Sequence, residues 1–267
     1  MHTWHWHTWH GLQYLVCDLL KPWRHGFFTR QFYPQSPAEL TTILHPNARV
    51  FRVQQVHGNT VLSITEWQLA MEQTNCNAAS HDVARDCYPQ ADGLITETAH
   101  QSVWTCSADC TPVLLGDEHT GQVVAVHAGW RGTAQKIVPE AIRRLLERGS
   151  HVANLRVALG PAIAGTVYQV GKDVAIKTIS TITSLVSADE TLAALARLPN
   201  SPILPDPDQD RVRLDVRRVI ALQLEQLGLA PEQIAIAPYC TYQQPELFFS
   251  YRRDHQKYVQ WSGIVSF

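Results

Sequence analysis

Two apolar runs joined by a short turn constrain the fold of this chain more than any other feature. The Val-rich runs are residues 112–117 (PVLLGD) and 122–128 (QVVAVHA), separated by a turn-like Glu-His-Thr-Gly segment. This pattern predicts an antiparallel hairpin. If the turn is centred on the Glu-His pair, Cys110 faces His127 with Cβ atoms about 4.5–5.5 Å apart. A bulge at Gly121 would shift this register by one residue.

Short β-rich runs and helical patterns alternate along the rest of the chain, and this predicts a sheet core flanked by helices. Strands are expected within residues 48–56, 102–107, 155–159, 233–238 and 247–254. Helices are expected at residues 133–148, 171–186 and 216–228, and a surface excursion or short helix at 66–90. Pro139 is expected to disturb the first turn of its helix, and the proline-rich segment 198–211 to be a loop.

The composition excludes several classes of protein. The net charge is −2 and no long run of one sign occurs, which argues against binding to nucleic acid or an anionic membrane. No apolar stretch reaches the ~18–20 residues that span a bilayer, and no export signal precedes the first strand, so we expect a cytoplasmic protein. The six cysteines are therefore expected to be free thiols or metal ligands rather than disulfides.

The predicted hairpin places two metal-ligating side chains together. A thiolate from Cys110 and an imidazole from His127 can reach one metal ion, and a catalytic zinc usually takes three protein ligands. His57 ends a β-rich run beside a Gly-Asn turn and is the natural third ligand. The alternative is that each side chain makes ordinary hydrogen bonds. Asp109 either orients a ligand, acts as acid or base, or caps a turn, and Arg131 either holds an anion or pairs with a carboxylate.

The first ten residues, MHTWHWHTWH, hold four His and three Trp. Histidine-rich tracts can bind metal, but here composition is the only argument for it. Trp4 alternates with Trp6, and His5 with His7, as on the two faces of a strand. The sequence therefore favours an edge strand over a metal site.

Several strings resemble the laccase-domain family, whose bacterial members are called polyphenol oxidases or purine nucleoside phosphorylases. The strings are FFTR, QVHGN, ADGLIT, SADCTPVLL, VHAGWRGT, LGPAI and FFSYRRD. The resemblance implies a single α/β domain (α+β-type) over residues 1–267, with mixed β-sheets flanked by helices in a layered sandwich. It also implies one zinc ion per chain on His57, Cys110 and His127, and substrate or phosphate contacts from Arg30, Asn59 and Arg131.

The resemblance also implies an activity. Family members cleave adenosine, inosine, guanosine and methylthioadenosine with phosphate as co-substrate, and they deaminate adenosine; Asp109, Cys110 and His127 are the catalytic candidates. The expected partners are thus purine nucleosides and phosphate, and the expected state is a monomer or small homo-oligomer. Three alternatives stay open. One is a copper-dependent phenol oxidase, which the small number of clustered ligands disfavours. The others are a cysteine hydrolase or deamidase with Cys110 as nucleophile and His127 as base, and a structural zinc module with Cys106 or Cys240 as fourth ligand.

The sequence departs from the family pattern at four places. The loop after FFTR reads QFYPQSPAEL, Gln169 replaces a carboxylate, Ile220 replaces an asparagine, and KYV at 257–259 replaces Thr-Gly-Arg. None of these changes removes a proposed zinc ligand. They are expected to affect substrate preference.

Overall fold

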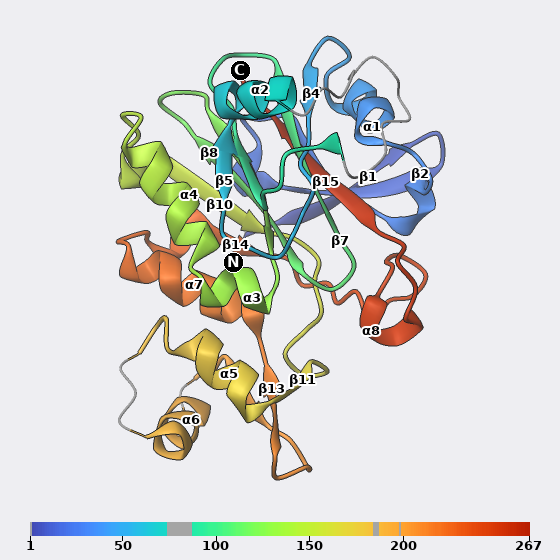
Figure 1. Ribbon diagram of the computed structural model, residues 1–267. Coiled ribbons are helices and arrows are strands. Elements are labelled where there is room, and N and C mark those ends of the chain that lie inside the picture. Colours follow the sequence, from blue (N-terminus) through green and yellow to red (C-terminus); the bar gives the residue numbers. More distant parts are fainter. Residues whose placement is uncertain (1, 74–86, 184–186, 198) are drawn as a thin grey trace.

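Two six-stranded sheets form the centre of the computed structural model, which describes residues 2–73, 87–183, 187–197 and 199–267 (Figure 1). The first sheet has the order β1 (Trp4–Trp9), β2 (Leu12–Cys17), β3 (His25–Phe28), β15 (Gln260–Val265), β7 (Gln101–Ser107), β4 (Arg49–Phe51). The second has the order β14 (Ile234–Ile236), β10 (Leu155–Leu159), β8 (Thr111–Asp117), β9 (Val123–Ala128), β6 (Gly93–Ile95), β5 (Val61–Ser63). Both sheets are mixed, because β4 runs parallel to β7, β14 to β10, and β5 to β6.

The alternation of side chains along the strands creates two cores. On β8, Leu114 points toward the first sheet, whereas Val113 and Leu115 point to the opposite face. The inward-facing residues of both sheets, such as Phe27 and Leu114, form one buried core between the sheets. The outward-facing residues of the second sheet form the other core with the helices. The two sheets therefore pack face to face, and helices form an outer layer on each side of them. This arrangement confirms the predicted fold class.

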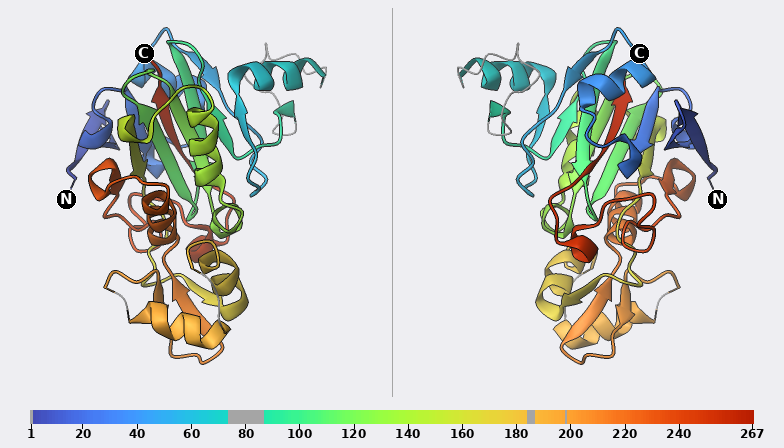
Figure 2. Two further views of the ribbon diagram at one scale, coloured as in Figure 1. Left: turned by 90° about the vertical axis from the view of Figure 1, so that its left-hand side faces the viewer. Right: turned by 90° about the vertical axis from the view of Figure 1, so that its right-hand side faces the viewer.

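The helices cover the outer faces of both sheets. α1 (Pro37–Leu44) packs on the first sheet, and α4 (Ile137–Leu146) and α7 (Val216–Gln226) pack on the second. The remaining helices of the described residues are α2 (Ile64–Gln73), α3 (Trp130–Ala134), α5 (Lys172–Ile179), α6 (Ala188–Ala196) and α8 (Tyr251–Asp254). Figure 2 shows α5 and α6 with the small sheet β11 (Gln169–Gly171), β13 (Arg211–Leu214), β12 (Ile203–Pro205) at one end of the molecule.

Local side chains decide where the helices begin. Ser36 and Glu39 form a capping box at the start of α1, and the Asp215 side chain accepts a hydrogen bond from the N–H of Arg218 at the start of α7. The helix expected at 133–148 is broken into α3 and α4 by Lys136, which adopts a left-handed conformation with φ of 59°. Pro139 then lies in the first turn of α4, where its missing N–H has no helical partner to lose.

Two strand and loop predictions are wrong. Residues 198–211 are not all loop, because β12 pairs with β13 at an edge of the small sheet, where a proline at the end of a strand is tolerated. Residues 247–254 are not a strand. The hydroxyl of Ser250 caps the N–H of Arg253 to start α8, and the Arg253 guanidinium donates to the carbonyls of Thr241 and Phe248. These local bonds outweigh the β-propensity of the aromatic run.

Two other regular elements are shorter than expected. The helix expected at 171–186 ends with α5, where the hydroxyl of Thr181 bonds to the carbonyl of Thr178; residues 184–186 lie outside the described part. The strand expected at 48–56 contains only β4 and an isolated bridge at Gln54. The α2 helix lies in the expected region 66–90, of which residues 74–86 are outside the described part.

The cysteine prediction needs one correction. Cys17, Cys106, Cys110 and Cys240 are free thiols as expected, but Cys87 is disulfide-bonded. The prediction was based on cellular compartment and chain length. Compartment and chain length do not indicate which cysteines the fold brings close enough to bond.

The tryptophan- and histidine-rich tract forms β1, the edge strand of the first sheet. Trp4 packs against Phe27 with ring centroids 5.5 Å apart, and Trp6 donates to the Tyr239 hydroxyl at 2.9 Å. His5 and His7 point to the solvent side. The predicted strand is confirmed, and within the described residues this tract contributes no donor to a three-ligand group. The described helices are all too short or too polar to cross a lipid bilayer.

His25 on β3 should make stability depend on pH. Burial lowers the pKa of this imidazole to about 4, although its hydrogen bond to the carbonyl of Trp23 opposes the shift. The neutral ring also accepts the N–H of Cys17. The unfolded chain takes up a proton near pH 6.5 and the folded chain does not. Stability therefore falls as the pH drops from about 6.5 toward 4. We expect this residue to contribute about 2 kcal/mol to the loss of unfolding free energy between pH 7 and pH 4.5.

Denaturant unfolding at several pH values, on the wild type and on His25→Gln, measures this contribution. The variant should be less stable at neutral pH and should lose less stability on acidification. The same loss in both proteins would contradict the assignment.

Candidate metal centre

The register of the β8–β9 hairpin determines where its ligand side chains lie. Pro112 pairs with His127, so the predicted pairing of Cys110 with His127 is wrong by two residues. The reason is a longer turn than expected, closed by a bond from the N–H of Asp117 to the carbonyl of Gln122 at 2.9 Å. Because side chains alternate with a period of two, a two-residue shift leaves Cys110 and His127 on the same face. That face points toward the first sheet.

The residue that extends the register opposite Cys110 is Gly129. A Cβ atom added to Gly129 would lie 2.6 Å from the sulfur of Cys110, which is far closer than two such atoms can approach. The absence of a side chain therefore makes room for the thiol beside His127. The sequence HAGW therefore contains both the candidate ligand His127 and the glycine that leaves room for the Cys110 thiol.

His57 lies on a turn between β4 and β5 that a buried carboxylate holds in place. The N–H groups of Val56, His57 and Gly58 all donate to the side chain of Asp92, at 3.2, 3.0 and 2.7 Å. This cradle stabilises the left-handed backbone of His57, whose φ is 61°. The imidazole is thereby directed toward the end of the hairpin.

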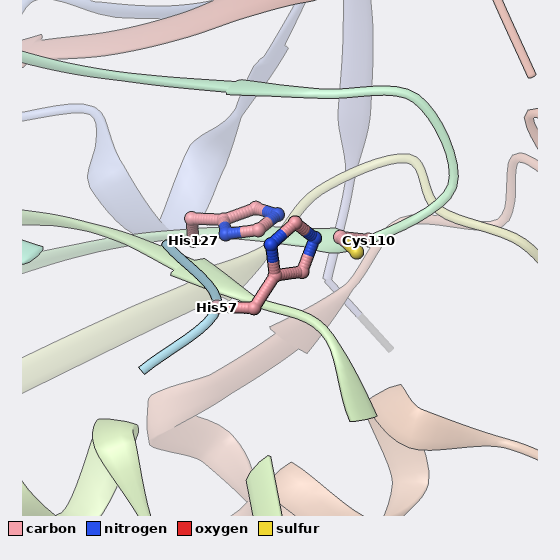
Figure 3. Close-up of side chains that lie close together, drawn as sticks. All are labelled: His57, Cys110 and His127. Atoms are coloured by element: carbon pink, nitrogen blue, oxygen red, sulfur yellow. The ribbon is translucent and has the colours of Figure 1, made fainter. Parts of the chain in front are cut away.

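The three predicted ligands converge at one point (Figure 3). One ligand atom from each of His57, Cys110 and His127 lies within 4.8 Å of the others, and no second group of this kind exists among the described residues. The two imidazole rings are 4.8 Å apart at 81°, so they do not stack. His57 is exposed, Cys110 is half-buried and His127 is buried. Neither Cys106 nor Cys240 belongs to the group.

The charges around the group favour a ligating thiolate. Burial raises the pKa of the Cys110 thiol, but the charge of His127 and hydrogen bonds from His127 and His57 outweigh it and lower this pKa to about 6. Burial likewise lowers the pKa of His127, yet the Cys110 thiolate and Asp92 together raise it to about 9. Two imidazoles and a thiolate are donors that suit zinc, so the residues present fit this ion.

Asp92 is the main functional residue that the sequence reasoning missed. Its side chain is inaccessible to solvent and lies 2.8 Å from Nδ1 of His127, in addition to its three backbone contacts. Burial opposes its ionisation, but the bonds from His127 and from the backbone of Gly58 lower its pKa. A carboxylate in this position fixes the orientation and tautomer of a ligand histidine. The available signal was an acidic residue in ADGLI, directly before an apolar strand.

Asp109 and Asn59 connect the group to neighbouring segments. The carboxylate of Asp109 accepts from the Thr241 hydroxyl and from the N–H of Arg252, both at 2.7 Å. Asn59 donates to the carbonyl of Gln135 at 3.2 Å, which links the His57 turn to the region between α3 and α4. Asp109 directly precedes Cys110, Asn59 lies two residues after His57, and both candidates connect neighbouring segments.

The two candidate arginines lie in different surroundings. Arg131 is exposed at the start of α3, with its guanidinium 4.7 Å from the centre of the Trp130 ring. The guanidinium of Arg30 donates to the carbonyl of Pro245 at 2.7 Å and lies 4.6 Å from the centre of the Phe249 ring. Neither Arg30 nor Arg131 is among the described residues that line the clefts beside Cys110.

A cleft of about 240 Å³ opens directly onto the group. The residues that line this cleft include the three candidate ligands and also Tyr251, Lys257 and Tyr258. A second, smaller hollow beside Cys110 is lined in part by Tyr168. Burial and the nearby Cys110 thiolate raise the pKa of Tyr168 to about 12, so its hydroxyl stays protonated at neutral pH. The spacing of these tyrosines gave no signal in the sequence.

This chain is similar in sequence to named proteins and in fold to solved structures. A purine nucleoside phosphorylase from Synechocystis sp. (slr1573) is 50% identical over 270 residues, which cover 99% of this chain and 97% of the relative. A purine nucleoside phosphorylase from Mycobacterium tuberculosis (Rv2149c) is 33% identical over 78% of this chain and 69% of the relative. The crystal structure of YlmD from Geobacillus stearothermophilus matches with a TM-score of 0.78 at 22% identity over 98% of each chain, which shows the shared fold.

The family itself follows from a match over most of the chain. The family model described as multi-copper polyphenol oxidoreductase laccase matches residues 36–266. This range contains all three ligand residues and Asp92. Together with the relatives, it confirms the resemblance that the sequence strings indicated. The chain belongs to the multi-copper polyphenol oxidoreductase laccase family.

Proposed function

We propose that this protein is a zinc-dependent purine nucleoside phosphorylase that also deaminates adenosine. The observation that carries the proposal is the group of His57, Cys110 and His127, with Asp92 behind it, at the side of an open cleft. The names of relatives that share up to 50% of the sequence support the choice of substrate. The two reactions are adenosine plus phosphate to adenine and ribose 1-phosphate, and adenosine plus water to inosine and ammonia.

Three protein ligands leave one coordination position open, and a zinc ion held in this way supplies a Lewis acid at the cleft. The same set of two histidines and a cysteine also occurs in blue-copper sites, which add a weak axial ligand such as methionine. No methionine lines the cleft in the described part of the chain. We therefore propose zinc, and the intense visible absorption of a copper–thiolate pair would reveal copper instead.

The side chains near the ligands suggest a division of roles. We assign the exposed guanidinium of Arg131 to phosphate, because it has a positive charge and lies four residues after a ligand histidine. In phosphorolysis the bond between the base and the sugar breaks with its electrons on the purine, which then needs a proton. The hydroxyl of Tyr168 is our candidate donor, because this residue lines the hollow beside Cys110. The bonds of Asp109 to Thr241 and Arg252 favour a positioning role over the proton transfer expected from the sequence.

A cysteine hydrolase is the second candidate, and one observation favours it. The low pKa of Cys110 beside His127 would also suit a nucleophilic thiolate with an imidazole partner. Such an enzyme has no need of a third donor, whereas His57 is directed at the same point by a dedicated backbone cradle. The third donor therefore favours metal binding.

The phosphate requirement tests the proposed function directly. Metal-loaded protein incubated with adenosine should release adenine only when phosphate is present, and should form inosine with or without it. A strong zinc chelator should suppress both products. Release of neither product by zinc-loaded protein would contradict the proposal.

Substitution of Arg131 tests the phosphate assignment. Arg131→Ala should lower kcat/KM for phosphorolysis by about 10- to 100-fold, because one charge-assisted contact to phosphate is lost, while deamination changes little. Arg143→Ala is the matched control, since Arg143 is an exposed arginine on α4 that pairs with Glu140 and Glu147 away from the ligands. Equal loss of both reactions in Arg131→Ala would instead indicate a structural role.

A further inference from the structure

Three aromatic rings gather beside the cleft. The ring of Tyr258 lies 5.4 Å from that of Phe249 and 5.1 Å from that of Tyr33, and Tyr33 in turn lies 5.5 Å from Phe249. Phe249 is buried, whereas 42% of Tyr258 and 51% of Tyr33 are exposed to solvent. The guanidinium of Arg30 lies 4.6 Å from the centre of the Phe249 ring and supports the cluster from behind. Two exposed tyrosines are therefore held on a rigid base.

One of these tyrosines belongs to the wall of the ligand cleft. Tyr258 lines the cleft of about 240 Å³ together with His57, Cys110 and His127. Lys257 is the one charged side chain that lines this cleft besides the metal-ligand candidates, and no described carboxylate does so. The wall thus presents an aromatic surface and amide groups to a ligand. An uncharged planar ring with polar edges suits such a wall better than a cation does.

Two sequence departures from the family pattern meet at this cluster. Tyr33 lies in the loop that reads QFYPQSPAEL, and Tyr258 is the central residue of KYV at 257–259. These segments are more than two hundred residues apart in the chain, and yet their rings are in contact. The departures therefore act as one structural unit beside the cleft.

We propose that Tyr258, held in place by Tyr33 and Phe249, is the surface on which the purine base of the nucleoside stacks. This inference rests on the proposed function and names the residue that determines its specificity for a planar base. A base on the Tyr258 ring lies in the same cleft as the three ligand side chains, so the glycosidic bond of the nucleoside is brought toward them. Stacking on an aromatic side chain acts on any purine. Because every base has such a planar face, Tyr258 favours a planar base in general and leaves the choice among bases to contacts with the ring edges.

Binding and turnover of Tyr258 variants test the inference. Calorimetric titration of zinc-loaded protein with inosine, which cannot be deaminated and is not cleaved without phosphate, gives Kd, and steady-state assays of adenosine with phosphate give kcat and KM. Tyr258→Ala should raise both Kd and KM about tenfold or more, with little change in kcat, because a stacking surface binds the ground state and the transition state alike. Tyr258→Phe keeps the ring and should stay within about twofold of the wild type. Tyr33→Ala should raise Kd and KM by less, since it removes only the ring that holds Tyr258 in place.

Trp9→Ala is the matched control, because Trp9 is also 42% exposed, packs on a neighbouring ring and lies on the edge strand β1. It should bind inosine like the wild type. Wild-type turnover of adenosine combined with unchanged Kd and KM in Tyr258→Ala would overturn the stacking assignment and leave the proposed function standing. Absence of inosine binding and of adenosine turnover in the wild type would overturn both.

Discussion

Asp92→Asn is expected to damage both the stability and the metal affinity of this protein. The carboxylate accepts four hydrogen bonds, from the backbone of residues 56–58 and from Nδ1 of His127. In an asparagine, an NH₂ group replaces one of the two carboxylate oxygens and cannot accept the N–H groups that this oxygen bound. The hydrogen bonds to that oxygen are therefore lost. Breaking such a buried pair costs about 3–5 kcal/mol of unfolding free energy. Loss of the partner of a ligand histidine weakens zinc binding by about 10- to 100-fold.

Denaturant unfolding measures the first effect, and competition with a chelator of known affinity measures the second. Asp117→Asn is the matched control, because Asp117 is equally buried but lies at the turn of the same hairpin, far along the strand from the ligands. Its Oδ1 accepts two backbone N–H groups, and its Oδ2 has no partner, so an asparagine fits there. Asp117→Asn should leave zinc affinity unchanged. Zinc affinity that is equal in the two variants would contradict the role given to Asp92.

Cys110→Ala is expected to remove the metal altogether. The thiolate is one of the three donors that the described residues bring together, and its negative charge would offset the charge of the ion. Elemental analysis of purified protein should fall from about one zinc per chain to near zero, and both proposed activities should be lost with it. Full retention of zinc in Cys110→Ala would overturn the ligand set.

Cys106→Ala and Cys240→Ala serve as controls and test the structural-zinc alternative. Cys106 lines the same cleft as the ligands, and the sulfur of Cys240 accepts the N–H of Ala164 at 3.3 Å. Both variants should keep their zinc if the fourth position is open. Loss of zinc from either one would identify a fourth protein ligand and favour a structural ion.

The ligand pair on the hairpin could be predicted because it depends on alternation alone. The turn length was judged wrongly, yet Cys110 and His127 stay on one face, since an error of two residues does not change the side. An error of one residue would have separated them. Turn length depends on local hydrogen bonds such as that of Asp117, and apolar periodicity does not report these.

Other parts of the site could not be read from the sequence because they depend on long-range contacts. Asp92 reaches the turn at 56–58 only after β5 and β6 have paired. Tyr33 and Tyr258 meet only after the C-terminal segment has packed beside the first sheet. The start of α8 was missed for a different reason, since a single hydroxyl on Ser250 reversed the preference of a strongly apolar run.

The cradle around Asp92 has a consequence for how the proposed site would take up a metal ion. Since hydrogen bonds of the chain itself hold His57 and His127 in place, the donors do not have to be gathered by the ion. Zinc fingers, in contrast, fold only when the metal arrives. In the proposed site the ion would therefore enter a molecule that is already assembled. The proposed activity would then follow the supply of metal, and a depleted molecule would be restored by reloading rather than by synthesis of a new chain.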